Sequence, residues 1–166
     1  MAERMAHGFG KGQAMIETVV AMVFLTFVFL GLFWLSRLLS ARIMLDHAAA
    51  RAARARSVGF NDFMCRKTAR AAIIPVAGRR VWPEPDIGDF EEAARIPVYL
   101  ASESESEARG ILEYEYWNTS HLSIDDGALD ISPVETRVRM ETDDFSMEGK
   151  ARIEAHFPHY MTNGGR

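Results

Sequence analysis

The longest apolar segment of the chain lies near its N-terminus. No charged side chain interrupts the 19 residues from Thr18 to Ser36. As a helix rising about 1.5 Å per residue, this segment covers roughly 28 Å, close to the ~30 Å hydrocarbon core of a bilayer. The pattern therefore predicts a membrane-spanning helix whose apolar surface includes Phe24, Phe29 and Trp34.

Two other interpretations of this segment are weaker. The apolar part of a cleaved secretory signal is about 7–15 residues long and ends at a small-residue cleavage site. Here the run is longer and continues through Arg37 into helix-forming sequence. A buried helix of a soluble protein would have to be enclosed on all sides, which a small acidic domain can hardly achieve. A retained membrane helix is the better interpretation.

The helix is predicted to continue well beyond the apolar segment. Residues 37–57 are almost entirely good helix formers, and Gly59 is the first residue placed to end the helix. One helix over residues 14–57 would be about 66 Å long. Its second half is rich in alanine, with Leu38, Leu45 and Ala49 on one stripe. Small side chains let neighbouring helices, or a covering sheet, approach closely.

The C-terminal part shows a strand pattern. Residues 134–141 place Val, Thr, Val and Met on one face and charged side chains on the other, and residues 149–157 alternate in the same way. Thr142 to Asp144 carry the composition of a turn between them. The pattern predicts an antiparallel hairpin with one buried and one solvated face.

The middle of the chain gives weaker signals. Asn61 and Asp62 are suited to cap a short helix that stops at Pro75, and residues 78–88 predict a loop or an edge strand around Val81 and Trp82. Residues 90–95 are weakly helical, and residues 96–100 fit a short helix or an extended segment.

Residues 103–117 fit both periodicities. Leu112, Tyr114 and Tyr116 alternate with glutamates as in a strand, yet the same region also fits a helical spacing. Serines at 102 and 104 each precede a glutamate by three residues, which is a helix-capping signal. We therefore expect a helix over about 103–117.

Together these elements predict an α+β protein. We expect a leader over residues 1–12 that is disordered and cleaved, a long helix over 13–58 with its transmembrane half at about 18–36, and a globular head with an antiparallel sheet and short helices over 59–166.

The charge distribution limits the partners. The chain of 166 residues has a formal net charge of −4, but residues up to Ser57 carry seven basic and three acidic side chains, and the remainder carries twelve basic and twenty acidic ones. An acidic head argues against nucleic acid as a partner. Cys65 is the only cysteine, so no disulfide forms within the chain. We expect a buried thiol; a disulfide between chains is the alternative.

No residue set indicates catalysis, a metal or a cofactor. Ser/His/Asp and Cys/His sets in a motif-like context and phosphate loops are absent, so we expect that the protein is not an enzyme. Four of the histidines and one acidic cluster are better explained as surface or turn residues than as ligands: His47, His121, His156, His159, Asp125, Asp126 and Asp130.

One short motif precedes the apolar segment: Gly12-Gln13-Ala14-Met15-Ile16-Glu17. Glycine, then a glutamate five residues later, then a long apolar helix resembles the processing site of type IV pilin-like proteins. With its basic, alanine-rich extension, the version here resembles the TadE-like pseudopilins of Tad (tight adherence) pili over roughly residues 11–58. One departure is that Thr18 follows Glu17, where such pilins often carry an aromatic residue.

The resemblance implies a function and a set of partners. A prepilin peptidase would cut between Gly12 and Gln13 on the cytoplasmic face. The single-pass protein would stay in the bacterial inner membrane, its C-terminal domain in the periplasm, until an assembly platform moved it into a filament with other pilins or pseudopilins. The length of the chain favours a minor subunit with a role in pilus assembly and adhesion, since the major Tad pilins are far shorter.

Glu17 has a physical role in this interpretation. A carboxylate in the apolar part of a membrane helix is costly and is expected to have a partner. The new α-amine of Gln13 on a neighbouring subunit would supply one. The alternative is an interfacial carboxylate that marks the start of the helix, where the helix dipole favours it.

Two points stay open in the sequence. Arg4 and Lys11 precede the span and Arg37 and Arg42 follow it, so the basic residues alone do not set its orientation. A signal-anchored periplasmic binding protein that never polymerises, or an anchored enzyme whose site has no recognisable motif, remain as alternative functions.

Overall fold

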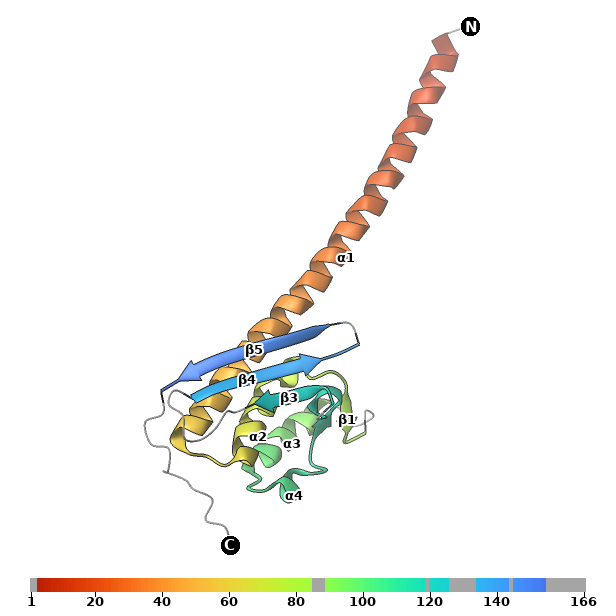
Figure 1. The fold of residues 1–166 in the computed structure, drawn as a ribbon. Helices are drawn as coiled ribbons and strands as arrows, with labels where there is room; N and C mark the ends of the chain where they lie inside the picture. Colours follow the sequence, from red (N-terminus) through yellow and green to blue (C-terminus); the bar gives the residue numbers. More distant parts are fainter. Residues whose placement is uncertain (1–2, 85–88, 119, 126–133, 144, 155–166) are drawn as a thin grey trace. The chain divides into compact units, whose positions relative to one another are not determined.

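The computed structural model describes residues 3–84, 89–118, 120–125, 134–143 and 145–154. The fold is α+β, as expected (Figure 1). The elements follow the order α1 (Glu3–Val58), α2 (Asp62–Ala72), η1 (Ile74–Val76), β1 (Arg80–Trp82), α3 (Asp89–Ala101), α4 (Glu105–Ala108), β2 (Glu113–Tyr114), η2 (Glu115–Trp117), β3 (Leu122–Asp125), β4 (Val134–Glu141) and β5 (Ser146–Ile153).

Helix α1 confirms the predicted long helix but begins earlier than expected. Residues 3–12, predicted to be disordered, are helical. No proline interrupts them, so helical hydrogen bonding continues through three glycines, each of which disfavours a helix by about 1 kcal/mol. The helix ends where predicted: Gly59 has a φ of 90°, and its N–H donates to the Arg56 carbonyl over 2.9 Å. A positive φ after the last helical turn is the usual role of glycine at a helix C-terminus.

The chain divides into two compact units, Met1–Leu39 and Ser40–Arg166. The division falls inside α1, so residues 40–58 belong to the unit that contains the sheet and the short helices. The first unit is the N-terminal part of α1 alone.

The larger sheet of the second unit has the strand order β3-β4-β5, and both pairs are antiparallel. Val134, Thr136, Val138 and Met140 are buried on one face of β4, which confirms the predicted alternation. Strand β5 begins three residues before the predicted position because the turn is short, with the Thr142 N–H donating to the Phe145 carbonyl over 2.8 Å. The end of the predicted strand, residues 155–157, lies outside the described residues.

Strand β3 is an element that the sequence does not predict. It pairs with β4 in the register Leu122–Met140 to Asp125–Arg137. Its short length, with only Leu122 buried, gives little pattern to detect.

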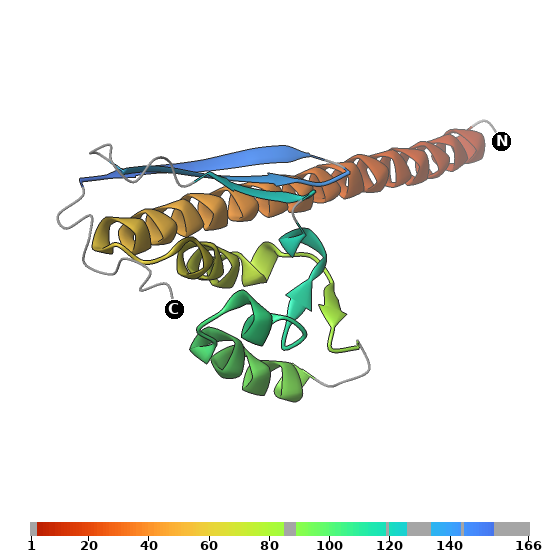
Figure 2. The ribbon, with the colours of Figure 1, turned by 60° about the horizontal axis from the view of Figure 1, so that its bottom comes forward.

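The sheet packs on the C-terminal part of α1 and on α2 (Figure 2). The surface of α1 in this contact is mostly alanine: Ala41, Ala48, Ala49 and Ala52 are at most 3% exposed. Gly149 of β5 comes closest: a Cβ placed there would lie 2.3 Å from the Leu45 backbone carbon and 2.6 Å from the Asp46 nitrogen. The sequence predicts that neighbouring helices or a covering sheet approach this alanine-rich stripe, and here the sheet does so.

Helix α2 starts as predicted. The Asn61 side chain accepts a hydrogen bond from the Met64 N–H over 2.8 Å, which is an N-cap. The helix ends at Ala72, and Pro75 lies in η1. Lys67 connects α2 to the end of α3, because its ammonium group donates to the carbonyls of Leu100 (3.0 Å) and Ser102. Burial lowers the pKa of Lys67, while Glu103 and Glu107 act to raise it.

Helix α3 resolves the segment that the sequence left open. Residues 96–100 are helical and continue from the weakly helical residues 90–95, with Pro97 inside the helix rather than in its first turn. The Ser102 hydroxyl then donates to the Tyr99 carbonyl over 2.7 Å, so Ser102 closes α3 instead of capping the next helix with Glu105.

The helix expected over 103–117 is wrong for most of its length. Ser104 caps α4 by accepting from the Glu107 N–H over 3.3 Å, as predicted, but α4 has only four residues. Gly110, with a φ of 78°, takes the chain out of the helical conformation. Beyond it, residues 113–114 form β2, which pairs with β1, so the segment around Val81 and Trp82, predicted as a loop or an edge strand, is a strand. The strand pattern was the better guide there.

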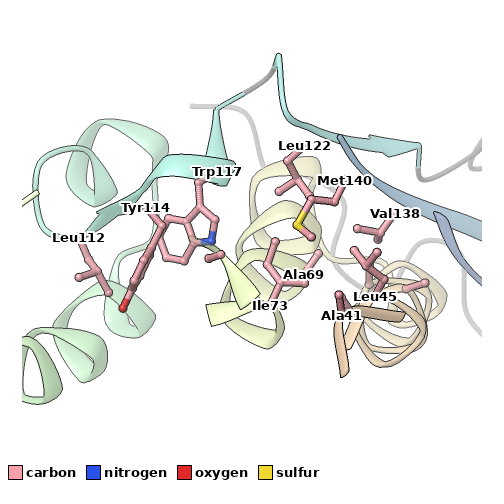
Figure 3. Packing of buried hydrophobic residues seen from close by; sticks show 14 of the residues in the cluster. Ala41, Leu45, Ala69, Ile73, Leu112, Tyr114, Trp117, Leu122, Val138 and Met140 are labelled. Atoms are coloured by element: carbon pink, nitrogen blue, oxygen red, sulfur yellow. The ribbon is translucent and has the colours of Figure 1, made fainter. Parts of the chain in front are cut away.

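The core of the second unit joins these elements (Figure 3). Leu45 of α1 lies against Val138 of β4, and Ile73 lies below Leu122 and Met140. On the side of α2 away from Leu45, the Trp117 ring contacts the rings of Tyr99 (5.1 Å between centroids) and Tyr114 (4.8 Å). These aromatic pairs hold α3 and β2 together.

Candidate membrane and assembly site

The residues predicted to act in processing and assembly all lie on α1. Gly12 is within the helix, and Gln13 and Glu17 follow it with exposed side chains. Because they are four residues apart, Gln13 and Glu17 lie on the same helix face, one turn from each other. Within the described part of the chain, the Glu17 carboxylate makes no hydrogen bond or ion pair. The structure therefore leaves this carboxylate without a partner from its own described residues.

The predicted membrane segment exposes large apolar side chains around the whole helix. Phe24, Phe29 and Trp34 are 69%, 53% and 58% exposed, and their apolar neighbours from Met15 to Leu35 are exposed as well. Isolated surface apolar residues are common, but a continuous surface of this kind marks a membrane or protein contact. In the described residues, one helix is long and apolar enough to span a membrane, and it contains this segment.

The hydroxyl groups in this segment are satisfied inside the helix. Thr18 donates to the Ala14 carbonyl over 2.8 Å, and Thr26 donates to the Met22 carbonyl over 2.9 Å. Such bonds to the preceding turn remove the need for water at a hydroxyl. Thr18, the departure from the aromatic residue common in similar pilins, is thus compatible with an apolar environment.

The apolar segment ends at exposed polar groups. Arg37 is exposed, and Arg42 pairs with Asp46 one turn later over 3.3 Å. Both side chains of this pair are about half exposed, so the pair adds little stability. Beyond Ser40 the helix face changes from exposed leucine and phenylalanine to buried alanine.

The other candidate residues do not form a site in the described residues. His47 is exposed, and His121 Nδ1 lies 3.0 Å from the Glu141 carbonyl at the end of the sheet. No group of three His, Cys, Asp or Glu side chains gathers in the part of the chain that the structure describes. Asp126, Asp130, His156 and His159 lie outside it.

Cys65 is fully buried, and its Sγ lies 3.6 Å from the Phe60 carbonyl. The expectation of a buried thiol is confirmed. A disulfide between chains would require the head to open at this point.

One feature of the head has no signal in the sequence. A pocket of about 290 Å³ lies between α2, α3, α4 and β2, with Arg70, Tyr99 and Trp117 in its lining. These residues are far apart in the chain and fall in three different elements, so only the fold brings them together.

The comparison with known protein families gives one match. The family of TadE-like proteins matches residues 12–54, from the glycine of the processing motif to the alanine-rich part of α1. No curated protein and no solved structure matches the chain. The matched segment contains Gly12, Gln13, Glu17 and the whole apolar segment. Over residues 12–54, the chain is therefore similar to the TadE-like proteins.

Proposed function

We propose that this chain is a minor pilin or pseudopilin of a Tad-type pilus, with a structural role in pilus assembly. The observation that carries the proposal is the position of Gly12, Gln13 and Glu17 directly before the exposed apolar segment of α1, all inside the region that matches the TadE-like family. The helix would hold the protein in the bacterial inner membrane in a single pass, with the head in the periplasm. The role is structural rather than catalytic.

Processing would be the first step. A prepilin peptidase would cut between Gly12 and Gln13 on the cytoplasmic face. In the structure this bond lies within a helix, so the helix has to unwind there for the bond to enter a peptidase. Glycines at positions 8, 10 and 12 make this easier, because each disfavours a helix by about 1 kcal/mol relative to alanine.

Assembly would follow from the new N-terminus. A carboxylate near the centre of a membrane costs at least about 2.5 kcal/mol, and less toward the interface. In a bundle of staggered helices, the Gln13 α-amine of one subunit would lie beside Glu17 of another and offset that cost. The amine exists only after cleavage, so processing would permit assembly. The partners are the peptidase, the other pilins or pseudopilins, the inner-membrane assembly platform and the lipid bilayer.

A substitution at the proposed cleavage site tests the first step. We expect Gly12→Ile to retain residues 1–12, because a branched side chain next to the scissile bond blocks its fit in the peptidase. An immunoblot of membranes from the host would show one band at the size of the unprocessed chain. Gly10→Ile is the matched control and should be processed normally. Complete processing of the Gly12→Ile chain would contradict the assignment of the site.

The alternative function is a signal-anchored periplasmic binding protein that does not polymerise. The pocket in the head favours it. It predicts that the chain stays in the membrane fraction after pili are sheared from the cells. The pilin proposal predicts that a small amount of the mature chain appears with the sheared filaments.

A further inference from the structure

The head pocket is lined by both apolar and polar side chains. It lies between α2, α3, α4 and β2 and has a volume of about 290 Å³, roughly the size of one amino-acid residue with its neighbouring backbone. Six of its lining residues matter for the argument: Phe63, Arg70, Tyr99, Leu112, Tyr114 and Trp117. Figure 3 shows three of them, Leu112, Tyr114 and Trp117, side by side at one end of the core.

Two buried polar atoms in this lining lack a partner, and a third interacts with Arg70 alone. Arg70 Nε and Trp117 Nε1 make no hydrogen bond to any described residue, and the Tyr99 hydroxyl interacts with the Arg70 side chain. Tyr99 is only 2% exposed and Trp117 only 6%. Buried polar groups in folded proteins are nearly always hydrogen-bonded, so two unpaired donors at one pocket point to an absent ligand.

These three groups act mainly as hydrogen-bond donors. A guanidinium and an indole N–H donate and cannot accept. Burial raises the pKa of Tyr99, although the charge of Arg70 and a hydrogen bond with its side chain act to lower it, so the phenol keeps its proton at neutral pH. Among the described residues, no carboxylate lies within ion-pair distance of Arg70, and Glu105 at the rim pairs instead with Arg66 over 3.4 Å.

We propose that this pocket binds a single carboxylate group attached to a small apolar body. The two oxygens of a carboxylate match the planar fork of the Arg70 guanidinium and accept from the neighbouring donors. Phe63, Leu112 and Tyr114 supply an apolar wall for the rest of the ligand. The lining also contains exposed Glu105, Glu113 and Arg109, so with Arg70 its formal charges balance, and a monocarboxylate is preferred over a dicarboxylate or phosphate.

The first measurement is a titration of the full chain in a non-ionic detergent, followed by ligand-observed NMR. N-acetyl-leucine should bind saturably, whereas N-acetyl-leucinamide, which has the same apolar body without the charge, should bind at least about tenfold more weakly. Inorganic phosphate should not compete. Equal binding of acid and amide, or no saturable binding of the acid at millimolar concentration, would overturn the proposal.

Two variants connect binding to the named residues. Arg70→Gln and Tyr99→Phe should each weaken N-acetyl-leucine binding, the first by at least about tenfold because it removes a charge-assisted bond. Arg152→Gln removes the same charge from an exposed position on β5 and should leave binding unchanged. Without ligand, Tyr99→Phe should change the melting temperature little, because its hydroxyl interacts with the Arg70 side chain alone. Unchanged binding by both pocket variants would contradict the assignment.

A further comparison separates the two sources of such a carboxylate. A blocked tetrapeptide that ends in leucine with a free carboxylate should bind at least about tenfold more tightly than N-acetyl-leucine if the ligand is the C-terminus of a polypeptide. Equal affinities would identify a free small acid as the ligand. Both results support the carboxylate site. A tetrapeptide with an amidated C-terminus that binds as tightly as the acid would overturn it.

Discussion

Replacing Gly149 with valine should destabilise the head domain more than any other single substitution in the larger sheet, β3-β4-β5. Even the first carbon of a side chain would lie 2.3 Å from the Leu45 backbone carbon and 2.4 Å from its oxygen. Both atoms belong to the backbone of α1, so no side chain can move aside, and β5 has to separate from the helix. We expect a loss of about 3 kcal/mol or more in the free energy of unfolding, at the upper end for overpacked positions.

Urea unfolding of the full chain in a non-ionic detergent, followed by tryptophan fluorescence, measures this change. Gly149→Ala should give a smaller loss in the same direction, because it adds only the first carbon. Glu148→Val is the matched control: it places the same side chain on the exposed face of β5, where the effect should stay within about 0.5 kcal/mol. A Gly149→Val chain as stable as the wild type would show that β5 does not pack on α1 as described.

Replacing Glu17 with glutamine should abolish incorporation into filaments without preventing membrane insertion. Glutamine keeps the size and the hydrogen-bonding atoms of the side chain but removes its charge. In an apolar helical bundle this leaves the α-amine of a neighbouring subunit without its counter-charge. Breaking a buried ion pair from one side costs about 3–5 kcal/mol, which corresponds to more than a hundredfold in affinity.

The amount of mature chain in sheared filaments, relative to the amount in the membrane, measures this effect. Glu3→Gln is the matched control, because it removes a carboxylate from the segment that processing would discard. Its incorporation should equal that of the wild type. Normal incorporation of the Glu17→Gln chain would contradict the proposed pairing and leave Glu17 as an interfacial carboxylate only.

The elements with strong, regular patterns could be predicted from the sequence. The alternation of residues 134–141 matches the burial of β4 residue by residue, because one face of a half-buried strand has to be apolar. The alanine stripe predicted a close contact, and the sheet makes it. In both cases the local pattern and the tertiary contact favour the same structure.

The misses occurred where local signals conflicted. In residues 103–117 the capping serines favoured a helix, while Leu112 and Tyr114 followed a strand spacing. Gly110 decides between them, because it adopts a positive φ and frees the chain to pair with β1. In the leader the glycines suggest disorder, whereas the structure has a helix there, because the adjoining helix extends through them.

The predicted assembly residues and the head pocket differ in how far apart their residues lie in the sequence. Gly12, Gln13 and Glu17 are neighbours in the sequence, so their spacing alone suffices to predict a processing site. Arg70 and Tyr99 come from different helices and gather only when the head folds. A local motif can be found by reading the sequence, whereas a pocket built from distant segments requires the structure.

The most direct test of the pilin proposal is the intact mass of the wild-type chain, purified from the membranes of its host and combined with N-terminal sequencing. The account predicts a chain that begins at Gln13 and lacks residues 1–12. A chain that still begins at Met1 or Ala2 would contradict it.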